Sequence, residues 1–121
     1  MLYDVVGGDS MNVNISADYI RGHIDTIILK LLSKSDMYGY QISKEIYRLS
    51  DKTYQLKEAS LYSSVKRLEN DLAIKSYWGE ESQGGRRKYY QITDVGLKML
   101  SENLKSWQQT KQLLNTLLED E

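Results

Sequence analysis

The chain has 121 residues, 40% of them hydrophobic, and a net charge of −1. This length suits one compact domain with at most one appended element. It contains no Cys, which excludes disulfides and thiolate chemistry. No apolar run approaches the ~18 residues that a membrane span needs, and the first residues lack the basic and apolar regions of a signal peptide. We therefore expect a cytoplasmic protein that does not interact with membranes.

The first half of the chain predicts three helices. Residues 1–16 show no clear period and contain paired glycines, which indicates a flexible N-terminal extension. From Asp18, apolar residues recur at spacings of three and four, and 33–37 interrupts the pattern. A polar stretch, 50–55, separates the two later helices. The apolar stripes are Ile20, Ile24, Ile27, Ile28, Leu31 and Leu32, then Tyr38, Ile42, Ile46 and Leu49, then Leu61, Val65, Leu68 and Leu72.

The hydrophobic period then changes, which predicts a β-hairpin. Segments 74–79 and 88–93 are short and rich in aromatic residues, with Ile74 and Trp78 on one face and Tyr77 on the other. Between them, 80–86 contains two adjacent glycines, which reach backbone angles closed to other residues. Three consecutive cations begin at Arg86. The hairpin should therefore have a mobile, basic tip.

A long helix should close the chain. Thr93 is a suitable N-cap, Asp94 suits the first turn, and the helical pattern runs to about Leu118. So small a domain cannot bury the whole apolar seam of this helix, which predicts a homodimer with the partner's first helix as a second surface. Lys111 interrupts the seam, either to fix its register or as a snorkelling side chain. The seam consists of Leu97, Leu100, Leu104, Trp107, Leu114 and Leu118.

Three helices followed by a basic hairpin is the element order of a winged helix-turn-helix. The predicted class is mainly α with a small β-hairpin (α+β), with a winged-helix DNA-binding domain at 17–93 and a C-terminal dimerisation helix at 94–121. The third helix would lie in the major groove, and the hairpin, as the wing, would follow the DNA backbone or minor groove. A dimer would bind double-stranded DNA at a pseudo-palindromic operator.

The candidate DNA contacts lie on the helix-turn-helix and the wing. Small and hydroxyl-bearing residues open the third helix, which lets it approach base edges, and cations follow. The alternative is that these residues form an ordinary solvated face and that the wing cations only decorate the surface. The candidate residues are Tyr40, Ala59, Ser60, Tyr62, Ser63, Lys66 and Arg67 on the helices, and Gly84, Gly85, Arg86, Arg87 and Lys88 on the wing.

Three ordered motifs resemble the PadR family of transcriptional regulators over residues 19–118. The first is Arg21-Gly22 in its Ile-rich helix, followed by Tyr38-Gly39-Tyr40-Gln41-Ile42. The second is Glu58-Ala59-Ser60-Leu61-Tyr62, followed by Lys66-Arg67-Leu68-Glu69. The third is Gly84-Gly85-Arg86-Arg87-Lys88-Tyr89-Tyr90, with Ile92-Thr93 and Gly96.

The single C-terminal helix resembles the short PadR subfamily, in which this helix packs against the partner chain. Segment 76–90 and Ser106-Trp107 are similar to multidrug-responsive repressors of that subfamily, in which a Trp from each chain flanks a flat apolar pocket at the dimer centre. The resemblance implies a repressor released by planar aromatic molecules bound at Trp107. Lys111 stands where an acidic or neutral group would better serve cationic ligands.

Two other classes remain as alternatives. Ser63-Ser64-Val65-Lys66 matches the S-x-x-K pattern of serine acyl-enzymes, but the companion Lys-Thr-Gly motif is absent. His23 is the sole histidine, and the chain has neither the His and Cys ligands of a metal site nor a phosphate-binding glycine loop before a helix. We therefore expect no catalytic residues, no metal and no cofactor. A winged-helix module that binds only proteins is the second alternative.

Overall fold

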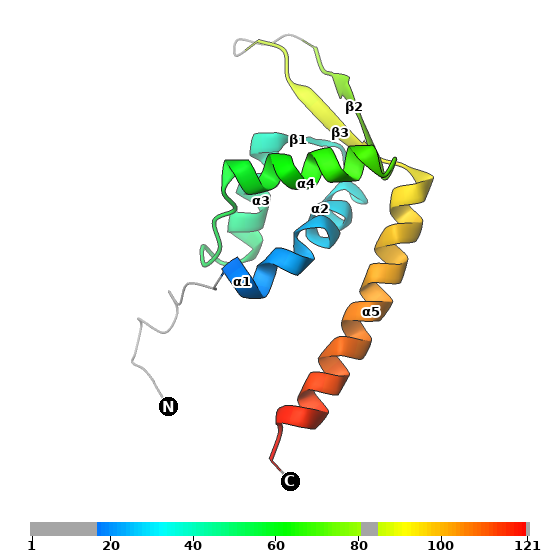
Figure 1. Ribbon diagram of the computed structural model, residues 1–121. Coiled ribbons are helices and arrows are strands. Elements are labelled where there is room, and N and C mark those ends of the chain that lie inside the picture. Colours follow the sequence, from blue (N-terminus) through cyan, green and yellow to red (C-terminus); the bar gives the residue numbers. More distant parts are fainter. Residues whose placement is uncertain (1–16, 81–84, 121) are drawn as a thin grey trace.

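The computed structural model describes residues 17–80 and 85–120, so the predicted N-terminal extension, 1–16, lies outside the described residues. Helices predominate, and a small antiparallel sheet accompanies them, which confirms the predicted fold class (Figure 1). The elements in chain order are α1 (Ala17–Ile20), a 3₁₀ turn (Arg21–His23), α2 (Ile24–Leu32), β1 (Met37–Tyr38), α3 (Gly39–Leu49), α4 (Glu58–Asn70), β2 (Ile74–Trp78), β3 (Lys88–Ile92) and α5 (Asp94–Leu118).

The first predicted helix is divided into two. A 3₁₀ turn separates α1 from α2, and Gly22 lies at its centre. Glycine is the poorest helix former after proline, because an unrestrained backbone loses more entropy when it is ordered. The apolar period continues through this turn, which explains why the sequence pattern alone predicted one uninterrupted helix.

The predicted hairpin is part of a three-stranded sheet with the strand order β1-β3-β2. β2 and β3 pair as predicted, with Ile74 opposite Ile92 and Trp78 opposite Lys88. β1 was not predicted, because a strand of two residues is too short to show an alternating pattern and its partner β3 lies 50 residues further along the chain.

The core lies around α2, which packs against α4, α5 and β3. Leu100 of α5 belongs to this core and is only 6% exposed, so its predicted place in a dimer seam is wrong. The first turns of α5 pack beside β3 and α2, and Leu100 points into its own domain. The buried hydrophobic residues of this core are Ile24, Ile28, Leu29, Leu31, Leu32, Ile42, Ile46, Leu56, Leu61, Val65, Leu68, Ala73, Ile74, Tyr90 and Leu100.

Leu72 was predicted on the apolar stripe of the third helix, and this prediction is wrong. α4 ends at Asn70, and Leu72 has a φ of +63° and is 70% exposed. Its backbone N–H donates to Glu69, and that of Ala73 donates to Leu68, which closes the helix with a tight reversal. The chain needs this reversal to enter β2, and the side chain of Leu72 is turned outward as a result.

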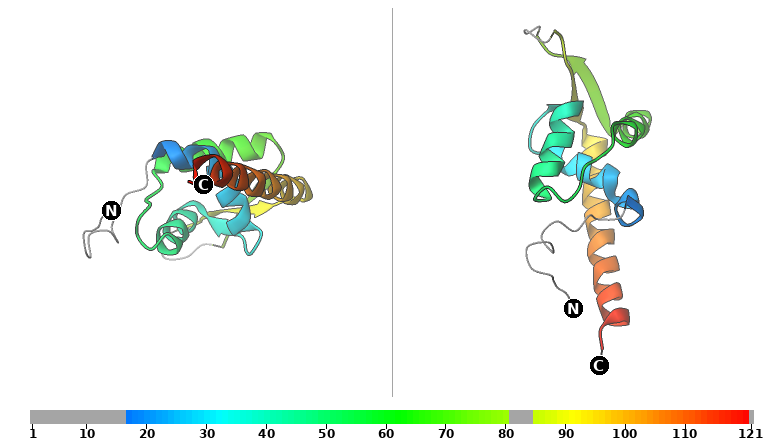
Figure 2. Two further views of the ribbon diagram at one scale, coloured as in Figure 1. Left: turned by 90° about the horizontal axis from the view of Figure 1, so that it is seen from below. Right: turned by 90° about the vertical axis from the view of Figure 1, so that its left-hand side faces the viewer.

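The second half of α5 extends beyond the rest of the domain, on the side away from the hairpin (Figure 2). Thr93 caps the helix, as predicted, by accepting a 3.1 Å hydrogen bond from the backbone N–H of Gly96. Every described residue after Asn103 is exposed. In the part of the chain that the structure describes, no helix is both long enough and apolar enough to cross a membrane.

Candidate nucleic-acid interface

α4 has one buried side and one exposed side. Leu61, Val65 and Leu68 fix the buried side in the core, and Ser64 is buried beside them. The predicted contact residues follow the opposite side: Ala59, Tyr62, Ser63 and Lys66 are exposed, and Ser60 is half-buried. A helix anchored in this way presents a complete face to solvent, as a recognition helix must do before it enters a groove.

The first turns of α3 and α4 lie directly against each other. A Cβ atom on Gly39 would stand 2.6 Å from the Tyr62 hydroxyl, so a larger residue would displace the tyrosine. The next residue, Tyr40, is exposed, and the Lys44 amino group lies 5.4 Å from the centre of its ring. Tyr40 and Tyr62 therefore lie near the starts of two helices that pack against each other, although they belong to separate sequence motifs.

Arg67 is bound within its own domain. Its Nε and Nη2 atoms donate to the two carboxylate oxygens of Asp25 on α2, at 2.8 and 2.7 Å, and Nη2 also donates to Ser64. Burial acts to raise the pKa of Asp25, but hydrogen bonding by Arg67 and Ser64 outweighs it and holds that pKa below its ordinary value. A two-point ion pair occupies the guanidinium group, and a DNA phosphate would have to compete with it.

Tyrosine rings connect the wing to the start of α3. The rings of Tyr77 on β2 and Tyr89 on β3 stack with their centroids 5.7 Å apart, and Tyr38 meets Tyr89 edge-on at 5.4 Å. The Tyr77 hydroxyl donates to Asp36 at 2.6 Å. A Cβ atom on Gly79 would lie 2.4 Å from the Tyr89 ring, so glycine is required there. These contacts fix the base of the wing against the turn that precedes α3.

The three wing cations each lie over a different aromatic ring. The guanidinium carbon of Arg86 lies 5.2 Å from the centre of the Trp78 ring, and that of Arg87 lies 4.7 Å from the centre of the Tyr38 ring. The amino nitrogen of Lys88 lies 6.0 Å from the centre of the Tyr90 ring. All three side chains are exposed. A cation over an aromatic face keeps its charge in solvent while its position is restricted. The predicted basic wing is therefore an ordered array of cations.

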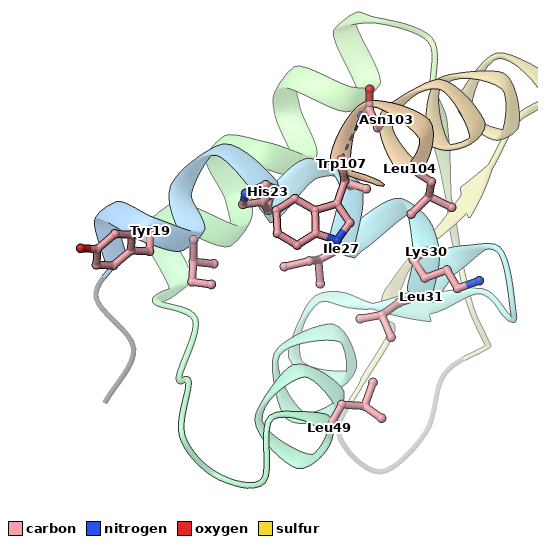
Figure 3. Close-up of a pocket in the computed structure, with 11 residues that line it drawn as sticks. Tyr19, His23, Ile27, Lys30, Leu31, Leu49, Asn103, Leu104 and Trp107 are labelled. Carbon is pink, nitrogen blue, oxygen red and sulfur yellow. Dashed lines mark hydrogen bonds between the residues drawn. The ribbon is translucent and has the colours of Figure 1, made fainter. Parts of the chain in front are cut away.

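A pocket of about 440 Å³ lies between α5 and the N-terminal helices (Figure 3). The predicted ligand residue Trp107 lines it and is 38% exposed. Its ring meets His23 edge-on with centroids 5.0 Å apart, and Asn103 donates to Thr26 at 2.9 Å beside it. The lining residues are Tyr19, Ile20, His23, Thr26, Ile27, Lys30, Leu31, Leu49, Asn103, Leu104 and Trp107.

Some residues of this surface were not predicted. Asp36, Tyr77 and Trp78 are absent from the predicted contacts, although the aromatic alternation in 74–78 and 88–92 was a usable signal. Gly85 has a φ of +86°, which fits its predicted place in the turn, whereas Gly84 lies outside the described residues. No group of three or more His, Asp or Glu that could hold a metal ion occurs within 17–80 and 85–120.

These features define a winged helix-turn-helix protein: α3 and α4 are the helix-turn-helix, α4 is the recognition helix, and β2 and β3 are the wing. The model of the PadR-like family of transcriptional regulators matches residues 28–102. The chain belongs to this family, as its sequence motifs predicted. The matched family and two of the similar solved structures are transcriptional regulators, which confirms the prediction that the chain is not an enzyme.

Three similar proteins illustrate the relationship. A transcriptional regulator from Clostridium thermocellum shares 48% identity and a TM-score of 0.80, with 87% of this chain and 99% of that one covered. A PadR family transcription regulator from Clostridium difficile R20291 shares 40% identity and a TM-score of 0.71, with 81% and 100% covered. An uncharacterized protein of Lysinibacillus sphaericus is 45% identical over 105 residues, which are 87% of this chain and 96% of that protein.

Proposed function

We propose that this chain is a sequence-specific DNA-binding repressor of transcription that acts in the cytoplasm as a homodimer. The observation that carries the proposal is the pairing of an anchored recognition helix, exposed along one side, with a wing whose three cations stand over aromatic rings. Figure 1 shows this wing rising beside α4. A helix for the major groove and cations for the phosphates are the two parts that a winged helix uses on DNA.

The proposed contacts divide between bases and backbone. Small and hydroxyl-bearing residues at the start of α4 approach base edges, and cations contact phosphates. Arg67 receives no DNA contact in this proposal, because Asp25 already binds it. The proposed base contacts are Ala59, Ser60, Tyr62 and Ser63, and the proposed backbone contacts are Tyr40, Lys66, Gly85, Arg86, Arg87 and Lys88.

The homodimer is proposed from the second half of α5. Trp107, Leu114 and Leu118 are exposed along one side of a helix that extends past its own domain, and Leu113 and Leu117 widen this apolar face. Burying one leucine side chain stabilises a protein by about 1.5–3 kcal/mol, so a second copy that covers this face gains several such contributions. Leu104 lies at the edge of the pocket and joins the same interface.

The DNA proposal is tested by fluorescence anisotropy with labelled duplexes from upstream of the protein's own gene. A dimer should prefer a duplex with two symmetric half-sites about 34–36 Å apart, which is one turn of DNA. The control is a scrambled duplex of equal length and composition at the same salt concentration. Equal affinity for both duplexes would contradict sequence-specific binding, and no binding to either would favour the module that binds only proteins.

Release by a planar aromatic molecule is a second proposed property. It is supported by the pocket at Trp107, which is mainly apolar and combines an indole with the polar edges of His23 and Asn103. An indole face stacks on a planar guest, and two-fold symmetry brings a second Trp107 close if the dimer forms as proposed. A guest bound there would couple to DNA affinity, because α5 begins directly after wing strand β3.

A further inference from the structure

The two arginines of the wing stand on opposite faces of the hairpin. The pairs Ile74–Ile92, Ser76–Tyr90 and Trp78–Lys88 share one face, because residues opposite each other in an antiparallel pair point to the same side. Ile74 and Tyr90 are buried, so this face packs on the helices. Arg86 stands over Trp78 on this face, whereas Arg87 stands over Tyr38, whose ring packs with Tyr89 of the opposite face.

Trp78 lies where the helix-facing side of the wing leaves the core. It is 57% exposed, although it continues the row formed by buried Ile74 and half-buried Ser76. Figure 1 shows the hairpin projecting beyond α3 and α4. An indole that is more than half in water lacks the stabilisation of full burial. Its environment is basic, because Lys88 is its cross-strand neighbour and Arg86 stands over its ring.

The chemistry of this corner fits a DNA strand. Arg86 and Lys88 supply positive charge, which attracts a phosphate backbone and disfavours a basic partner. The indole supplies a flat apolar face for a deoxyribose ring and one N–H donor for a phosphate oxygen. The face that carries these groups is the one that packs on the helices nearer the base of the sheet, so this corner lies on the same side of the hairpin as the helix-turn-helix.

We propose that Trp78 and Arg86 form one DNA-contacting unit on the helix-facing side of the wing, against the sugar-phosphate backbone of the strand that runs between wing and recognition helix. Arg87, held on Tyr38 at the start of α3, contacts a different phosphate on the other side of the hairpin. This inference rests on the proposed DNA-binding function and assigns Trp78 a contact that the basic motif alone does not indicate.

Fluorescence of Trp78 tests the contact directly. The chain contains two Trp, so Trp107→Phe leaves Trp78 as the sole indole, and sedimentation checks that this variant keeps the wild-type assembly state. Labelled upstream duplex is added, and DNA anisotropy is recorded together with indole emission. We expect the Trp78 emission to change with the same midpoint as the anisotropy. Binding with unchanged emission would overturn the unit but leave the proposed function standing, whereas absence of binding to every upstream duplex would overturn both.

A double-mutant comparison tests whether the two side chains act together. Trp78→Ala should weaken binding by about three- to tenfold, the range of a cation–π contact. Trp78→Phe keeps an aromatic face and should retain most of the affinity. The double variant Trp78→Ala/Arg86→Ala should lose little more DNA affinity than whichever single variant binds DNA more weakly. In the double variant Trp78→Ala/Arg87→Ala, the fold-losses in DNA affinity of the two single variants should multiply. Independent effects of Trp78 and Arg86, or wild-type affinity of Trp78→Ala, would overturn the proposal.

Discussion

The hydroxyl of Tyr77 donates a 2.6 Å hydrogen bond to the carboxylate of Asp36, 41 residues earlier in the chain. Gln91 on the neighbouring strand approaches the same carboxylate oxygen at 3.4 Å, so one aspartate contacts both wing strands. Asp36 directly precedes β1, which leads into α3. The bond therefore joins the wing to the helix-turn-helix, two parts whose relative orientation a DNA-binding surface must fix.

Tyr77→Phe should lower the thermal stability and reveal the contribution of this bond through its pH dependence. The hydrogen bond to Asp36, followed by burial and the negative charge, raises the pKa of Tyr77 above its ordinary value of 10.0. A raised pKa means that the stabilisation is complete below pH 10 and is lost as the pH rises through the folded-state pKa. The difference in stability between wild type and Tyr77→Phe, measured by thermal unfolding, should therefore disappear only in strong alkali.

Tyr47→Phe is the matched control for Tyr77→Phe. Tyr47 is also partly exposed, and its hydroxyl has no hydrogen bond to the residues that the structure describes. Its removal should leave both the stability and the alkaline pH profile unchanged. If the two variants behave alike, the Tyr77–Asp36 bond contributes nothing measurable to the orientation of the wing.

Removal of the Arg67 side chain should affect stability, whereas removal of the Lys66 side chain should affect DNA binding. Arg67→Ala should lower the free energy of unfolding by about 0.5–1 kcal/mol, because the pair is two-pointed but half-exposed to screening solvent. Lys66→Ala should leave stability unchanged and weaken DNA binding, with the salt slope reduced by about one. Urea unfolding and anisotropy separate the two effects. A large loss of DNA affinity in a fully stable Arg67→Ala protein would contradict the structural role of Arg67.

The Arg67–Asp25 pair also predicts a pH dependence at the acid end. The pKa of Asp25 is held below its ordinary value of 3.8, so the stabilisation is present above that pH and is lost as the pH falls through the folded-state pKa. The stability difference between wild type and Arg67→Ala should be constant near neutrality, should shrink as the pH falls below 3.8, and should vanish below the still lower folded-state pKa. A difference that persists at lower pH would show that packing of the arginine stem, and not the ion pair, is responsible.

The fold was predictable because its elements have local signals. Apolar spacing of three and four gave α2 to α5, alternation gave the hairpin, and the Thr93 cap was visible from its residue type. β1 carried no such signal, since two residues show no period and the strand exists only through its pairing with Tyr89 and Tyr90. Local pattern therefore predicts which elements form, but not every pairing between them.

The candidate site was predictable by residue type and only in part by role. Lys66 and Arg67 are indistinguishable as a basic pair in the sequence, and only the fold brings Asp25 to one of them. Leu97 and Leu100 share a seam pattern with Leu114, but the core takes Leu100 and leaves Leu97 exposed. Such assignments depend on contacts between residues far apart in the chain, and periodicity contains no information about those contacts.

Leu114→Asp should prevent dimerisation without unfolding the domain. Leu114 lies beyond the part of α5 that packs on its own chain, so a charge there disturbs only a partner. Sedimentation velocity should show a monomer, and circular dichroism should show a folded winged helix. Gln112→Asp, on the opposite side of the same helix and also exposed, is the control and should remain dimeric. A dimeric Leu114→Asp protein would contradict the proposed interface.

Trp107 should report a planar aromatic guest by stacking on it. The indole is 38% exposed at the edge of a pocket of about 440 Å³, which is large enough for a small polycyclic molecule. A guest that stacks on the ring should quench its fluorescence. Lys30 lines the same pocket, and Lys111 follows one turn after Trp107, so neutral or anionic dyes should bind better than cationic ones of equal size. Titration with matched neutral, anionic and cationic dyes measures this preference.

The comparison of two single-tryptophan variants makes this test specific. Trp78→Phe retains Trp107 and should keep the quenching, whereas Trp107→Phe retains Trp78 and should lose it while a planar side chain still fills the edge of the pocket. Trp107→Ala should also weaken dye binding measured by calorimetry, because the stacking face is gone. Equal quenching in both variants would place the dye elsewhere. A stable wild-type dimer that binds no dye would mean that side chains of the partner fill the pocket, and the proposed release by aromatic molecules would fail with it.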